Sequence, residues 1–262
     1  MNRNVLKLPF ILGVPPDWIC PTCTRGVLRI KKASFFKEER YGSRNRSQKD
    51  WDPEWIEYVY SCLLICTNDQ CQEVVANTGI GSLNLDCYED ENGKWVQEYH
   101  DLFRPKFFEP HLILLDIPEK CPESVSSPLH ESFTLFFSVP NAASNNVRIA
   151  IEELLTHLKV KRFNIIKGKR RFISLHQRIY LLPPKYAHLK DLILAIKWLG
   201  NSGSHGNGDA KGVITMDDVM DSYDLIEHIL HEIYAPKTKK LVALAKKVNK
   251  RKGRMKVLSL PF

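Results

Sequence analysis

The sequence contains no long apolar run, and its longest apolar stretches, such as Leu112–Leu115, end after a few residues. A membrane-spanning helix needs about 20 apolar residues, so we expect no membrane partner. The sequence also has no basic start followed by an apolar run and a small-residue cleavage site, so it predicts no secretory signal. No internal repeat is visible. We therefore expect a cytoplasmic protein whose 262 residues form one large domain or two ordinary ones.

Acidic residues are missing from the C-terminal segment. Between Lys237 and Lys256 the sequence has ten lysines and arginines and no aspartate or glutamate. Because the whole chain carries a net charge of +8, the rest of the chain carries −2. A nearly neutral body with a basic tail is often used for nucleic-acid contact, although charge runs also occur in tails that are merely solvated. The predicted nucleic-acid-binding residues are Lys246, Lys247, Lys250, Arg251, Lys252 and Arg254.

The cysteines do not suggest a disulfide framework. Their number is seven, which is odd, and no secretory signal accompanies them. This combination favours reduced thiols and metal binding over disulfides. Cys87 and Cys121 have no partner at metal-ligand spacing, so we expect them to be core or surface thiols.

Two closely spaced cysteine pairs are the most informative pattern that is present. Cys20 and Cys23 are separated by two residues, and Cys66 and Cys71 are separated by four. Such pairs are how a folded chain gathers four thiolates around one tetrahedral Zn²⁺, with Zn–S distances of about 2.3 Å. The sequence therefore predicts one structural zinc ion without an open catalytic position. The alternative is a set of ordinary buried thiols.

Cys62 competes with this ligand set because it lies close to Cys66 in sequence. If Trp55–Ile65 is a strand, Cys62 and Cys66 lie about 13 Å apart at ~3.3 Å per residue, which is too far to share one ion. Cys66 and Cys71 can converge if a turn follows Ile65, and Asn68-Asp69 supplies turn residues. We therefore exclude Cys62 from the predicted site.

The first part of the chain reads as β-rich. Val27–Ile30 and Trp55–Ile65 are predicted strands, the second because it is rich in β-branched and aromatic residues. The polar segment Lys37–Asp52 between them predicts a loop or a mobile hairpin tip. Three prolines make Phe103–Pro118 an expected extended connector. Further punctuation of strands is expected at Gly79–Gly81 and Glu91–Gly93.

From Ser124 onward the apolar residues recur at the spacing of helices that bury one face. Ser127-Pro128 predicts an N-cap followed by a first-turn proline. The other three predicted helices carry apolar stripes within residues 147–158, 189–199 and 219–233. The helix with the stripe at 189–199 is expected to end at Gly200 through a left-handed residue, and the last helix is expected to begin near Thr215. A short basic and β-like segment at residues 162–173 interrupts them.

These patterns together predict an α+β fold. A β-rich, zinc-ribbon-like module is expected at residues 1–118 and an all-α bundle at residues 119–236. A basic C-terminal tail is expected at residues 237–262.

The segment Gly200–Gly206 is the most unusual polar stretch. Asn201 and His205 are four residues apart and share a face if the turn is helical. Histidine serves as a general acid or base near neutral pH, and an asparagine amide can orient it or hold a phosphate. The alternative is that Asn201 caps backbone groups and His205 bonds a neighbouring carbonyl.

Several of these segments resemble one family, the prokaryotic domain-of-unknown-function 4145 family. The segments are Ser124–Pro128, Asn145–Leu155, Gly200–His205 and Met216–Tyr234. That family is similar to HEPN (higher eukaryotes and prokaryotes nucleotide-binding) domains, and its members often carry an N-terminal Cys-x-x-Cys zinc module. The resemblance implies an all-helical HEPN-like fold for residues 119–236, an antiviral-defence or toxin-related setting, and dimers formed through the helical domain.

The resemblance also implies candidate catalytic residues. Many HEPN proteins are RNases that use an arginine, a following polar residue and a nearby histidine, and the matching positions are Gly200, Asn201 and His205. Lys197 or Arg148 would have to replace the missing arginine, and lysine lacks its bidentate fork. We therefore expect RNA binding without cleavage. The alternatives are a metal-independent endoribonuclease, in which His205, Asn201, Lys197 and Arg148 act, and a protein-interaction adaptor.

Overall fold

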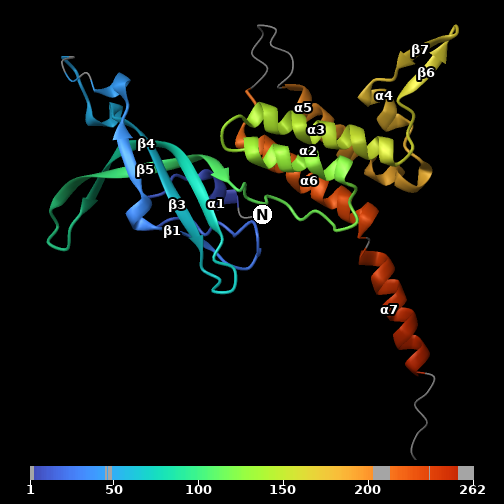
Figure 1. Ribbon diagram of the computed structural model, residues 1–262, viewed down its shortest axis with the longest axis horizontal. Helices are drawn as coiled ribbons and strands as arrows, with labels where there is room; N and C mark the ends of the chain where they lie inside the picture. Colours follow the sequence, from blue (N-terminus) through green and yellow to red (C-terminus); the bar gives the residue numbers. More distant parts are fainter. Residues whose placement is uncertain (1–2, 45, 47–48, 203–212, 236, 253–262) are drawn as a thin grey trace, which may run out of the picture.

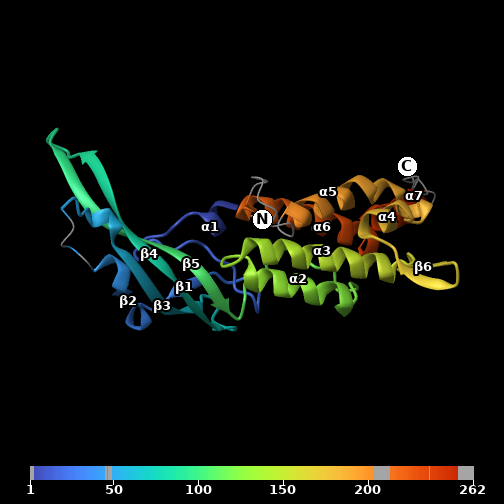
Figure 2. The ribbon, with the colours of Figure 1, turned by 90° about the horizontal axis from the view of Figure 1, so that it is seen from above.

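The computed structural model describes residues 3–44, 46, 49–202, 213–235 and 237–252. A β-sheet region occupies one end of the molecule and a group of packed helices the other (Figures 1 and 2). The last helix, α7 (Lys237–Lys252), projects away from both. The predicted α+β fold is confirmed. No helix in the described part of the chain is long and apolar enough to cross a membrane.

The first part of the chain is built from short helices and antiparallel strands. Its elements are α1 (Arg3–Lys7), β1 (Leu28–Ile30), η1 (Lys32–Ser34), β2 (Phe36–Glu39), η2 (Tyr41–Ser43), η3 (Pro53–Trp55), β3 (Glu57–Cys66), β4 (Val74–Glu89) and β5 (Trp95–Glu109). The strand order is β1-β3-β4-β5, and β2 also pairs with β3. Leu28 pairs with Cys66 and Phe36 with Ser61, so β1 and β2 lie end to end along one edge of β3.

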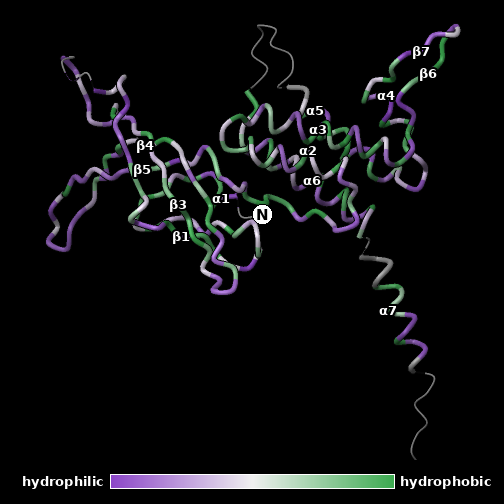
Figure 3. The backbone as a smooth tube through the Cα atoms, viewed as in Figure 1, coloured by the Kyte–Doolittle hydropathy of each residue, from purple (hydrophilic) through white to green (hydrophobic). Residues whose placement is uncertain are grey.

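Alternation along β3 defines the buried face of the sheet. Tyr60, Cys62 and Leu64 are buried, whereas the residues between them are exposed. This is the period of two that a sheet with one buried face requires. Aromatic rings fill the space beneath this face, and the Phe10 ring contacts the Trp18 ring edge-on at a centroid distance of 5.3 Å. The green, hydrophobic segments of Figure 3 mark these strands.

The aromatic core continues from the sheet into the helices. The Trp18 and Phe108 ring centroids lie 5.2 Å apart, and those of Phe108 and Phe137 lie 4.9 Å apart. Ion pairs add a second connection, because the Arg3 guanidinium on α1 lies 2.7 Å from the Asp221 carboxylate. The sheet and the helical bundle therefore share buried surface.

Two segments expected to be loops are strands. Lys37–Glu39 belongs to β2 and pairs with β3, and Phe103–Glu109 belongs to β5 rather than to a connector. The connector prediction was wrong for Phe103–Glu109, because β5 is an edge strand, where the missing N–H of Pro105 breaks no ladder on its free side. It is confirmed for residues 111–118, which form neither helix nor strand. The pairing of β4 with β5 shifts register next to this proline, between Thr78 and Gly79.

Gly79 and Gly81 lie inside β4 and do not end a strand, which corrects the sequence prediction. A Cβ atom on Gly79 would lie 2.2 Å from the Arg104 carbonyl oxygen and 2.8 Å from the Tyr60 ring. The glycine therefore permits a close approach of β5 to β4. Glu91–Gly93 does lie in the turn that joins the two strands, and Gly93 has a positive φ of 75°.

The second part of the chain is helical and contains one small hairpin. Its elements are α2 (Glu123–Leu135), α3 (Pro140–His157), β6 (Phe163–Ile166), β7 (Lys169–Phe172), α4 (Leu175–Tyr180), η4 (Pro184–Leu189), α5 (Lys190–Ser202) and α6 (Met216–Tyr234). Helices α2, α3, α5 and α6 lie side by side as a bundle (Figures 1 and 2). Deep in it, the Ser132 hydroxyl donates to the Ala143 carbonyl and lies 2.7 Å from the Tyr223 hydroxyl.

Two predicted helix ends were wrong. Helix α2 begins at Glu123 with Pro122 as its N-cap, so Pro128 lies inside the helix and not in its first turn. The buried residues Val125 and Leu129 on either side show that packing outweighs the hydrogen bond that Pro128 cannot donate. Gly200 does not end α5, which continues to Ser202. Helix α6 begins as predicted, with a capping box formed by Thr215 and Asp218.

Candidate metal centre and basic surfaces

The first cysteine hook is a tight knuckle. The Cys20 amide donates to the Gly26 carbonyl at 2.9 Å, and the Thr24 amide donates to the Cys20 carbonyl at 3.0 Å. Thr24 adopts a positive φ of 53°, which turns the chain back toward β1. Cys20 is fully buried and Cys23 is half-buried. Both sulfur atoms therefore point to the same side of the knuckle.

The second hook closes the end of β3. Cys66 is the last residue of that strand, and the Cys71 amide donates to the Asn68 carbonyl at 2.8 Å. The Asn68 side-chain oxygen accepts from the Gln70 amide, which is the turn expected for Asn68-Asp69. Because Leu28 of β1 pairs with Cys66, the sheet brings the second hook beside the first.

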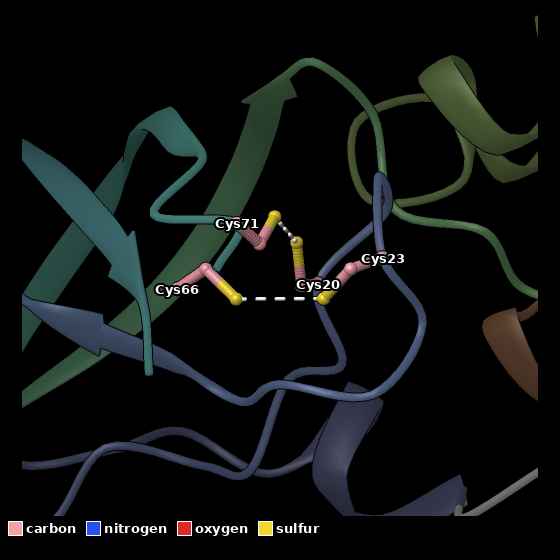
Figure 4. A group of neighbouring side chains, drawn as sticks. All are labelled: Cys20, Cys23, Cys66 and Cys71. Carbon is pink, nitrogen blue, oxygen red and sulfur yellow. Dashed lines mark hydrogen bonds between the residues drawn. The ribbon is translucent and has the colours of Figure 1, made fainter. Parts of the chain in front are cut away.

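The four sulfur atoms form a compact cluster (Figure 4). The Cys20 and Cys71 sulfurs lie 3.9 Å apart, the Cys23 and Cys66 sulfurs lie 3.6 Å apart, and all four lie within 4.8 Å of one another. A tetrahedron with Zn–S distances of about 2.3 Å has sulfur–sulfur edges of about 3.8 Å. The cluster therefore has the dimensions of a metal site made from four thiolates. Across the described residues it is the one such group found.

Backbone amides support the cluster electrostatically. The Gly26 amide donates to the Cys23 sulfur at 3.3 Å, and the Asn68 amide donates to the Cys66 sulfur at 3.4 Å. The Gly26 bond lowers the pKa of Cys23 to about 6, whereas burial raises the pKa of Cys66 to about 12. Holding four thiolates together here requires a bound cation, because a buried negative charge needs compensation.

Gly26 is a supporting residue that the sequence reasoning missed. A Cβ atom at this position would lie 2.3 Å from the Cys66 sulfur and 3.0 Å from the Asn68 backbone nitrogen. The position therefore admits glycine only, and it also supplies an amide to the sulfur of Cys23. The signal in the sequence is a glycine three residues after the first hook. The need for glycine there comes from the close approach of Cys66, which lies 40 residues later in the chain.

The remaining cysteines lie elsewhere. Cys62 is buried on the inner face of β3, and its sulfur lies 3.9 Å from the side-chain oxygen of Asn77. Cys87 is exposed on β4, and Cys121 is half-buried just before α2. Burial raises the pKa of both Cys62 and Cys121 to about 11, as expected of neutral thiols.

The second candidate site lies between α3 and α5. Arg148 on α3 forms an ion pair with Glu152 at 2.9 Å, and a Cβ atom on Gly200 would lie 3.1 Å from the Arg148 Cβ and 3.3 Å from its Cδ. Arg148 thus occupies the space that a side chain at position 200 would need. One turn away the Ser144 hydroxyl is buried without a hydrogen-bond partner, and so is the Arg148 Nε.

The other predicted members of that site are only partly described. Lys197 is largely buried on α5, and its ammonium lies 3.5 Å from the centroid of the Trp198 ring. The backbone of Asn201 is helical, but its side chain lies outside the described part. His205 lies outside the described residues altogether.

The predicted basic tail begins as a helix. Helix α7 has 16 residues, eight of them lysine or arginine and none acidic. Lys246, Lys247 and Lys250 are exposed. Arg251 and Lys252 lie at the helix end, where side chains are not described, and Arg254 lies outside the described residues. In the described part of the helix, these three lysines present positive charge to solvent.

Comparison with known protein families gives two matches. Residues 8–108 match the family described as Domain of unknown function (DUF8608), and residues 130–251 match the family described as Domain of unknown function (DUF4145). This second match confirms the resemblance to that family expected from the sequence. The DUF4145 match extends through most of α7, so it includes much of the segment that the sequence reasoning separated as a tail. No curated protein and no solved structure matches the chain.

Proposed function

We propose that this protein binds nucleic acid, with RNA as the favoured polymer, and does not cleave it. The observation that carries the proposal is α7, an exposed helix with eight basic residues and no acidic one. Each lysine or arginine that neutralises a phosphate releases a counterion, which favours binding at low salt. A helix also fixes the backbone that carries these charges, so binding costs less conformational entropy than it would for a flexible tail.

The α3–α5 site supports a second contact with phosphate. Arg148 offers a planar guanidinium, and the unpartnered Ser144 hydroxyl lies one turn before it. Hydrogen bonds between a guanidinium and a phosphate are stronger than neutral ones because both groups are charged. We therefore assign Arg148 and Lys197 to this contact, with Asn201 and His205 as the further members proposed from the sequence.

Zinc is proposed as the metal of the Cys20, Cys23, Cys66 and Cys71 cluster. The four thiolates complete its coordination, so the ion stabilises the β-rich module and leaves no position for a substrate. Its binding free energy then contributes to the folding free energy of that module. We propose that the protein acts in the cytoplasm, where thiols stay reduced, and by family resemblance in antiviral-defence or toxin-related systems.

The alternative function is a metal-independent endoribonuclease with a HEPN-like fold. One observation favours it: Arg148 lies against Gly200, where such enzymes carry an arginine. His205 would remove the proton of the RNA 2′-hydroxyl, which attacks the adjacent phosphorus, and the 5′-oxygen would leave. The product would be a 2′,3′-cyclic phosphate. A third candidate is an adaptor that binds protein only.

One experiment separates the three functions. Wild type, Arg148→Ala and His205→Ala are each incubated with end-labelled RNA in EDTA, and both binding and product size are measured. Binding by wild type without cleavage, weakened in Arg148→Ala, supports the proposal. Cleavage that leaves a cyclic phosphate and disappears in His205→Ala supports the endoribonuclease instead. Neither binding nor cleavage by a folded wild type refutes both and favours the adaptor.

A further inference from the structure

The part of β4 and β5 between residues 82 and 102 projects from the sheet as a long hairpin, which we call the arm (Figure 1). The arm contains six carboxylates and one lysine, a net charge of −5. Register places Trp95 opposite Glu89, Tyr99 opposite Leu85, and Asp101 opposite Leu83, so these residues share one face. That face therefore combines apolar and acidic side chains.

The apolar side chains of the arm are open to solvent at its outer end. Trp95 is 71 % exposed and Tyr99 is 44 % exposed, while Leu83 and Leu85 toward the sheet are half-buried. Large aromatic residues that are exposed on one face are the usual anchors of protein interfaces. The arm thus presents an apolar stripe bordered by negative charge.

Helix α7 presents the complementary surface. Leu241, Leu244 and Val248 follow the spacing of one helix face and are between 46 % and 64 % exposed. Lys247 neighbours Leu244 one turn along, and the helix carries eight positive charges in total. The apolar stripe of α7 is therefore bordered by positive charge.

The two surfaces match in length but cannot meet within one molecule as arranged. The 16 residues of α7 span about 24 Å at 1.5 Å per residue, and Leu83–Glu89 of the arm spans about 20 Å. The arm and α7 lie at opposite ends of the molecule (Figures 1 and 2). A contact between them therefore joins two molecules.

We propose that α7 of one copy docks on the arm of a second copy, with Leu244 and its neighbours against Trp95 and Tyr99. The contact is heterologous, because two different surfaces meet, and it generates rings or open chains. It goes beyond nucleic-acid binding and does not depend on it, since the apolar stripe of α7 makes the contact and Lys246 and Lys250 lie on other sides of the helix.

Sedimentation velocity of the full chain over a concentration series at low salt tests the proposal. The sedimentation coefficient of wild type should rise with concentration. Trp95→Ala should weaken self-association about thirtyfold, equivalent to about 2 kcal/mol, as for a central aromatic anchor. Tyr88→Ala is the matched control, because Tyr88 is 43 % exposed on the opposite face of the arm and its loss should change nothing.

Charge reversal tests the pairing itself. The arm variant E89K and the helix variant K247E should each weaken self-association, because both positions border the apolar stripes, and combining them in one chain should restore it. Asp90 is left intact because its carboxylate holds the turn amides of Asn92 and Lys94. Circular dichroism of each variant confirms that it is folded.

Three results would overturn the proposal. They are a wild type that stays monomeric at every concentration, an association that survives in folded Trp95→Ala, and a combined charge reversal that fails to restore it. Binding of wild type to phosphatidylserine vesicles in place of self-association also overturns it. Trp95→Ala should keep the RNA affinity of wild type. If wild type does not bind RNA, only the proposed function is refuted, because the sedimentation experiment does not depend on RNA.

Discussion

Replacing Gly26 with alanine is expected to disrupt the metal centre without touching a ligand. The new methyl group would lie 2.3 Å from the Cys66 sulfur, and ordinary contact begins at 3.4 Å, so the two atoms must separate by about 1.1 Å. Metal–ligand distances tolerate about 0.2 Å. The Asn68 backbone, 3.0 Å from the same methyl group, blocks the direct escape route. The four sulfurs can then no longer keep tetrahedral geometry around one ion.

We expect Gly26→Ala to lower zinc affinity by about 100-fold, the upper end of what changes next to the ligands cause. Competition against a chromophoric zinc chelator measures this directly. Gly42→Ala is the matched control, because no atom lies within 4 Å of a Cβ at that position and its affinity should equal that of wild type. If Gly26→Ala binds zinc as tightly as Gly42→Ala, the described packing around the cluster is wrong.

Three further predictions follow from the metal centre and the buried polar groups. Elemental analysis should find about one zinc ion per chain, and Cys23→Ser should unfold mainly residues 1–118; a metal-free native protein would contradict this. Burial lowers the pKa of both His111 and His130 in the folded state. Below about pH 6.5 the unfolded chain therefore takes up protons before the folded chain does, and the free energy of unfolding falls. Urea titrations across that range should show this fall. His130→Gln should reduce it, and an unchanged pH dependence in this variant would count against the explanation. Tyr223→Phe should cost about 1 kcal/mol of unfolding free energy, because it removes a buried hydroxyl that lies 2.7 Å from a serine hydroxyl, and an unchanged urea midpoint would show that this contact contributes nothing.

The sequence was sufficient where the structural signal is local. The two cysteine hooks predict their cluster because the spacing of metal ligands within each hook involves only residues close together in the sequence. The capping box of α6 is equally local, since Thr215 and Asp218 lie three residues apart. The bundle follows from apolar stripes that repeat every turn.

The sequence was insufficient where distant contacts decide the outcome. Pro105 suggested a connector and Pro128 suggested a helix start, but an edge position and core packing allow a strand and a helix to continue through them. Gly200 suggested a helix end, whereas in the structure it gives room to Arg148 on another helix. The role of Gly26 depends on the pairing of β1 with β3, which a local pattern does not reveal.

The salt dependence of RNA binding tests the central claim most directly. Fluorescence anisotropy with a labelled single-stranded RNA is measured from low to moderate salt for wild type, for K246Q/K247Q/K250Q in α7, and for the control K161Q/K169Q/R171Q near the β6–β7 hairpin. All six replaced residues are exposed, and both variants lose the same charge. Each phosphate contact contributes about −0.7 to the slope of log affinity against log salt, so the α7 variant should bind more weakly with a slope shallower by about 2. The control should keep the slope of wild type. Equal slopes for wild type and the α7 variant, or no RNA binding by wild type, would contradict a role for α7 in binding nucleic acid.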